Sequence, residues 1–201
     1  SADKLNVIDP STQEIAPRWI PAPVAVNTDP GTHRFVWDFS TRHDGGPLAP
    51  PGTYTVRLSV NGQTFTRNAV IVHDPRLAIT DRALLDQFTL ASAIDQKLTQ
   101  IASARARAQA LLKSGTLRAG RATRLRVILG DRGPGDLDDT IGKPAQDFST
   151  LRFLNMSFTA LFGAVEMADA APTHDQRIAF AKLSHTLDGT VAQLAAIAGP
   201  N

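Results

Sequence analysis

The chain has 201 residues, of which 42% are hydrophobic and 20% charged, with a formal net charge of +2. These are ordinary globular values, which exclude wholesale disorder and favour no charged partner. It contains no cysteine, which excludes disulfides, thiolate metal sites and cysteine nucleophiles. No segment approaches the roughly 20 apolar residues that a membrane-spanning helix needs, so we expect no membrane partner.

The first third of the chain is rich in Pro, Gly, Thr and Val, which is typical of a β unit. Four prolines interrupt residues 15–30 and predict an extended lead-in, because proline cannot donate to a sheet ladder. Residues 33–39 then alternate, with apolar side chains at every second position, and predict a half-buried strand.

Two more strands follow, joined by a tight turn. Apolar residues alternate up to Val60, Asn61-Gly62 supplies the positive φ angles of a type I′ hairpin, and the returning strand covers residues 63–72. Three strands predict a partial Ig-like antiparallel β-sandwich over residues 1–76, too few for a complete one.

From Thr80 the apolar period changes from two to about three and a half, which predicts an all-α long-helix bundle over residues 77–201. The first helix, capped by Thr80 or Asp81, extends to Lys113 and would be roughly 50 Å long. A second helix is expected over residues 117–129. The overall prediction is an α+β multidomain chain.

Two further helices are expected after a polar loop. One begins near Leu151 and ends near Ala170-Ala171. The other begins at Thr173, whose spacing from Gln176 is that of a capping box, and ends at Gly199-Pro200.

No catalytic, cofactor-binding or metal-binding residue is predicted. The five histidines show no metal-ligand spacing, and there is no nucleophile elbow or phosphate-binding loop. Asp136, Asp138 and Asp139 lie close together but lack the spaced ligands and final glutamate of an EF-hand.

The candidate interaction residues fall into two groups. An arginine-rich stretch around Arg118, Arg121 and Arg124 could bind phosphate, but it lacks interleaved aromatic residues, and acidic residues up to Asp147 follow closely. We therefore expect intramolecular pairing or a solvated face there, and no nucleic-acid partner. Trp19 and Trp37 could hold a carbohydrate or peptide if exposed.

Several segments together resemble a known family. The strand at residues 33–38, the turn at 49–58, Asp74-Pro75-Arg76 and residues 167–173 are similar to the C-terminal region of bacterial sortilin-like BNR/Asp-box β-propeller proteins labelled glycosyl hydrolases. The resemblance covers nearly the whole chain. It implies an Ig-like domain akin to that of flagellar hook-capping proteins, followed by a helical tail, in an exported protein that is periplasmic or secreted.

The resemblance also implies what the chain does. The Asp-box repeat of the propellers has no match here, so no catalytic residue carries over. Family members usually have one or two strands before the position of Ser1, and we expect the remaining β-propeller, a retained N-terminal fragment or a second copy in a homodimer to fill their place. The favoured function is a non-catalytic accessory or assembly module. The alternatives are a stand-alone carbohydrate- or peptide-binding module and an independent hydrolase.

Overall fold

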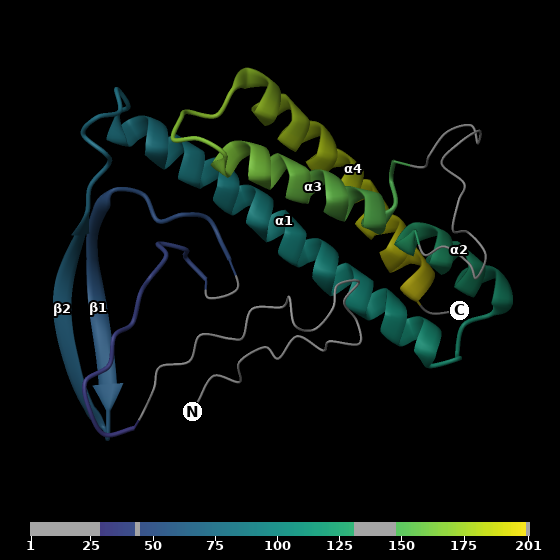
Figure 1. Cartoon of the computed structure of the whole chain (residues 1–201). Coiled ribbons are helices and arrows are strands. Elements are labelled where there is room, and N and C mark those ends of the chain that lie inside the picture. Colours follow the sequence, from purple (N-terminus) through teal and green to yellow (C-terminus); the bar gives the residue numbers. More distant parts are fainter. Residues whose placement is uncertain (1–28, 43–44, 131–147, 200–201) are drawn as a thin grey trace, which may run out of the picture.

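The computed structural model describes residues 29–42, 45–130 and 148–199. In chain order these form β1 (Gly52–Val60), β2 (Gln63–Ile71), α1 (Asp81–Lys113), α2 (Ala119–Leu129), α3 (Leu151–Glu166) and α4 (His174–Ala198). The hairpin lies beside the N-terminal end of α1, α3 and α4 lie along α1, and α2 lies at the far end (Figure 1). None of the described helices is both long and apolar enough to cross a bilayer.

The hairpin is as the sequence predicts. β1 and β2 pair antiparallel from Gly52 opposite Ile71 to Val60 opposite Gln63. Asn61 and Gly62 join them with φ angles of 49° and 79°, the left-handed pair that a type I′ turn requires. The mixed α and β composition is thereby confirmed.

The predicted strand over residues 33–39 is wrong. Within the part of the chain that the structure describes, these residues have no ladder partner, and the one pairing nearby is a single bridge between Ser40 and Leu48. Local hydrogen bonds form a turn here in place of a strand. Asp38 accepts a hydrogen bond from the Ser40 amide, and the Trp37 indole donates to the Ser40 carbonyl. Phe39 also has a φ of 63°, which a regular strand does not allow. The described residues therefore form a two-stranded sheet and not a sandwich.

The helical half follows its predicted pattern closely. The Thr80 side chain accepts from the Ala83 amide and so caps α1, which ends at Lys113 as expected. Side chains from all four helices share one core, whose largest fully buried members are Phe158, Ile94, Ile101, Leu125, Leu129, Leu151, Leu154, Leu187 and Leu194.

Helix α3 ends at Glu166, earlier than the predicted Ala170-Ala171. Side chains of other helices bind the backbone carbonyls at the end of α3 that a further helical turn would otherwise have bound. Gln87 of α1 donates its amide Nε2 to the carbonyls of Val165 and Ala168, at 2.6 and 2.8 Å. Capping by another helix satisfies carbonyls that would otherwise need a further helical turn.

The predicted capping box of α4 is confirmed. The Thr173 hydroxyl accepts from the Gln176 amide, and the Gln176 side chain accepts from the Thr173 amide. The Gln176 Nε2 also donates to the Ala164 carbonyl at 3.0 Å. The start of α4 is therefore tied to the end of α3.

Glycine is required where α2 meets α3. Gly130 ends α2 with φ of 72°, and a Cβ at this position would lie 2.9 Å from the Thr150 Cβ. Thr150 in turn caps α3 by accepting from the Phe153 amide. Only glycine allows the two helix ends to approach this closely.

Candidate functional site

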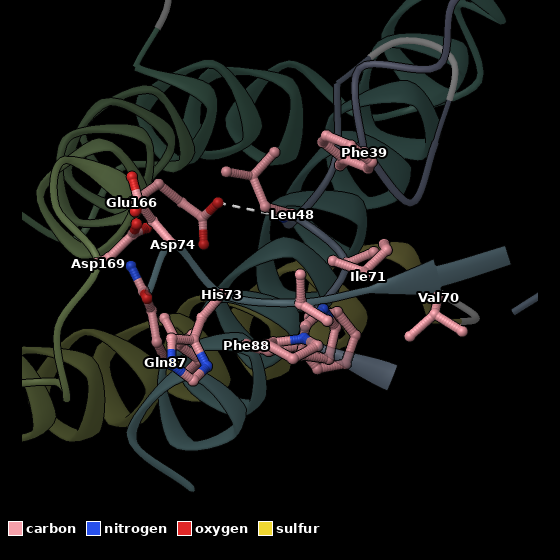
Figure 2. Close-up of a pocket in the computed structure, with 15 residues that line it drawn as sticks. Phe39, Leu48, Val70, Ile71, His73, Asp74, Gln87, Phe88, Glu166 and Asp169 are labelled. Atoms are coloured by element: carbon pink, nitrogen blue, oxygen red, sulfur yellow. Dashed lines mark hydrogen bonds between the residues drawn. The ribbon is translucent and has the colours of Figure 1, made fainter. Parts of the chain in front are cut away.

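A pocket of about 380 Å³ lies at the junction between the hairpin and the helices. One wall is apolar and includes Phe39, Leu48, Ile71 and Phe88, whereas polar side chains of Gln87, Glu166, Asp74 and Asp169 gather on the other side (Figure 2). The lining comes from the loop before β1, the end of β2, the first turns of α1 and the end of α3. A cavity with one apolar wall and a few convergent polar groups is the usual form of a small-ligand site.

Glu166 connects the two halves of the pocket. Its carboxylate oxygen Oε2 accepts a hydrogen bond from the Leu48 amide at 3.1 Å (Figure 2). Burial raises the pKa of Glu166 above its ordinary value; the Leu48 bond opposes this shift, and the negative charge of Asp169 adds to it. The ionised carboxylate is therefore held in an unfavourable setting.

Two other polar residues of the pocket are engaged by neighbours. The Arg76 guanidinium donates to Asp74, with 2.9 Å from Nε to Oδ1, and this bond lowers the pKa of the Asp74 carboxyl. His73 Nδ1 lies 2.7 Å from Asp81 Oδ1. Within the described ranges, no three His, Cys, Asp or Glu side chains come together as a metal-ion site.

The raised pKa of Glu166 predicts how stability responds to pH in a Glu166→Gln variant. Because the folded state holds this proton more tightly than the unfolded state, the stability contributed by Glu166 is greatest at low pH and falls as the group ionises. Glutamine keeps an acceptor for the Leu48 amide but carries no charge. The melting temperature of the variant minus that of the wild type should therefore rise between about pH 4 and pH 7.

Thermal unfolding followed by circular dichroism across this pH range checks the result. Asp175→Asn provides a contrast, because Asp175 is an exposed acid in the first turn of α4 and its charge favours the helix. That variant should lose stability at neutral pH. A Glu166→Gln difference that stays constant or falls with pH would contradict the assignment.

The predicted interaction residues do not form one site. Trp19 lies outside the described residues. Trp37 is half-buried, donates its indole N–H to the Ser40 carbonyl at 2.8 Å and packs edge-on against Phe39 and Tyr54, with ring centroids 5.3 and 5.7 Å away. These contacts fasten the loop to the hairpin, and the carbohydrate- or peptide-binding role of Trp37 stays a prediction.

The three arginines lie at the far end of the bundle. Arg118 is the residue before α2 and Arg124 lies within it, both exposed, whereas Arg121 is half-buried and donates to the Gly199 carbonyl at 3.1 Å. Arg121 thus satisfies a carbonyl at the end of α4. The acids expected to pair with this stretch, Asp136, Asp138, Asp139 and Asp147, lie outside the described residues.

Comparison with known proteins adds no family. No family model matches the chain, nor does any curated protein or solved structure. The resemblance to sortilin-like proteins therefore stays a prediction.

Sequence reasoning missed the residues of the pocket. Gln87 gave a usable signal, because it is a polar residue within the apolar stripe of α1, and a polar side chain on a buried face needs partners. Glu166 and Asp169 gave none. They gain their setting only when the end of α3 meets the loop at Leu48.

Proposed function

We propose that this chain is a non-catalytic accessory and assembly module that docks through the apolar face of its hairpin onto β-structure of the protein to which it belongs. By resemblance, that protein is an exported β-propeller protein of the sortilin-like type, and the hairpin is part of an Ig-like sandwich that the docked strands complete. The exposed apolar face of the hairpin carries the proposal.

The two faces of the hairpin differ in polarity. Residues paired across the strands share a face, and the register places Leu58 opposite Phe65 and Arg57 opposite Thr66. Hydroxyl groups and Arg57 dominate one face, and a contact of 3.2 Å joins Ser59 and Thr64 there. The other face is mainly apolar and open, with exposed fractions of 52% for Val56, 52% for Leu58, 46% for Val60 and 55% for Phe65, although Arg67 and Gln63 lie on it opposite Val56 and Val60.

This polarity is that of a strand pair whose apolar face packs against another sheet. Complete burial of such side chains contributes about 1.5–3 kcal/mol each, so covering the exposed half of each one gains on the order of 1 kcal/mol. In the described sheet each strand also has only one neighbour. The outer backbone groups can therefore pair with added strands, which favours β-structure as the occupant.

The hairpin is held in a defined orientation on the bundle. Arg42 of the preceding loop binds Asp95 of α1 at 2.6 Å, and Leu48 of the same loop binds Glu166 at the end of α3. The Tyr54 hydroxyl also donates to the Pro50 carbonyl at 2.6 Å. The hairpin would therefore bind a partner, and the bundle would fix the orientation of that partner.

The test is co-expression of the chain with the polypeptide that precedes it in its parent, followed by size-exclusion chromatography with light scattering. A one-to-one complex is expected. Leu58→Lys should weaken it by about 100-fold or more, since a lysine charge would be buried against apolar groups. Thr66→Lys, on the polar face of the same hairpin, is the matched control and should leave the complex intact.

Other outcomes decide against the proposal. A chain that binds no upstream polypeptide and remains monomeric would overturn the docking role. If the chain forms a homodimer that Leu58→Lys dissociates, the partner that covers the apolar face is a second copy of this chain and not strands of the parent protein. Hydrolysis of aryl glycosides by the purified chain would overturn the non-catalytic assignment.

A further inference from the structure

The polar wall of the junction pocket offers hydrogen-bond acceptors without matching donors. Gln87 is the most buried polar group there, with an exposed fraction of 7%. Its two donated bonds, to the carbonyls of Val165 and Ala168, fix the amide so that the nitrogen faces the end of α3. The opposite atom, Oε1, can only accept, and no described residue donates to it. This oxygen is not fully enclosed, so an added donor can reach it from the pocket.

The same wall carries negative charge that the described residues do not balance. Asp169 has no ion-pair partner among them, and Glu166 receives only the uncharged Leu48 amide. The neighbouring side chains that could supply donors are already engaged, because Arg76 binds Asp74 and the His73 ring contacts Asp81. Two carboxylates and one amide oxygen thus face a cavity without a counter-charge (Figure 2).

We propose that the junction pocket binds an aliphatic cation: an ammonium or guanidinium group, on a short apolar stem, donates to Gln87, Glu166 and Asp169. The stem lies along the apolar wall formed by Leu48, Ile71 and Phe88. The volume of about 380 Å³ is at the small end of the range for ligand pockets. This inference does not rest on the assembly role. Ile71 shares a face with Leu58 and Phe65, but it lies at the end of the hairpin away from the turn, whereas the docking residues lie toward the turn.

A bare divalent metal ion fits the pocket less well than an organic cation. Calcium takes six to eight oxygen ligands, and no group of three acidic or histidine side chains is placed to hold a metal in the described residues. A metal would also leave the apolar wall without a partner. An amine or guanidinium with a hydrocarbon stem satisfies both walls.

The test is titration of the full chain with butylguanidinium and butylamine, followed by two-dimensional NMR. Saturable shifts are expected at the Leu48 amide and the Gln87 side-chain amide, with butanol and butyrate producing none. Asp169→Asn and Glu166→Gln should each weaken binding at least about tenfold, since each removes one charge from the site. Asp175→Asn, which removes an exposed acid outside the pocket lining, should leave the affinity unchanged.

A second arm distinguishes the sources of the cation. A five-residue peptide with a central arginine between leucines is titrated in the same way. Tighter binding of the peptide than of butylguanidinium would identify a polypeptide side chain as the natural occupant, and equal binding would identify a small amine. Equal shifts with butanol, no saturation with either cation, or the same loss of affinity in Asp175→Asn would overturn the proposal.

Discussion

Replacing Phe158 by alanine is expected to lower the free energy of unfolding by about 3–5 kcal/mol. Phe158 lies in the middle of α3 and is fully buried, and its ring meets Phe180 of α4 edge-on with centroids 6.3 Å apart. The substitution removes buried apolar area, leaves a cavity that the surrounding helices can close only in part, and breaks the aromatic pair. Since a domain of this size is stable by only about 5–15 kcal/mol, much of the margin would be lost.

Urea denaturation followed by helical circular dichroism measures the effect. Met156 lies on the same helix with an exposed fraction of 60%, so Met156→Ala is a matched control that should change stability by less than about 0.5 kcal/mol. A loss below about 1 kcal/mol in Phe158→Ala would mean that α3 is not packed between α1 and α4 as described.

Replacing Gln87 by leucine is expected to cost about 2–4 kcal/mol, although leucine fits an apolar face better than glutamine. The reason is that the carbonyls of Val165 and Ala168 both lose their donor while remaining close to the core. The end of α3 and the connection to α4 should loosen first. Limited proteolysis between residues 167 and 172, compared with urea denaturation, measures the local and the global effect.

The control for this variant is Gln96→Leu, an exposed glutamine on the same helix. It should leave both cleavage and stability nearly unchanged. Equal protease resistance of Gln87→Leu and the wild type would show that the bonds to α3 contribute nothing to stability.

The parts of the fold that the sequence predicts correctly are those encoded locally. Asn61-Gly62 specifies a turn by its backbone conformation alone, and the Thr173 and Gln176 pair forms its capping box within four residues. The apolar stripe of α1 likewise sets its buried face regardless of what covers it.

The failures come from interactions that the local pattern does not contain. Residues 33–39 alternate as a strand should, but pairing requires a neighbour, and Asp38 instead bonds the Ser40 amide to form a turn. The pocket could not be predicted because its walls come from segments far apart in the chain, such as Leu48 and Glu166. Only Gln87, polar within an apolar stripe, carries a sequence signal for such a contact, and no prediction drew on it.

The modest size of the sheet has a consequence for how the molecule opens. An isolated two-stranded hairpin is marginally stable in water, so β1 and β2 depend on the loop contacts to α1 and α3 through Arg42 and Leu48. Their amide protons should exchange with solvent through local openings far below the global unfolding free energy, whereas those beside Ile94 and Ile101 should exchange only when the whole bundle unfolds. Binding of a partner at the apolar face would then slow amide hydrogen exchange most in β1 and β2. The binding surface would thus lie on the part of the described chain that opens most easily.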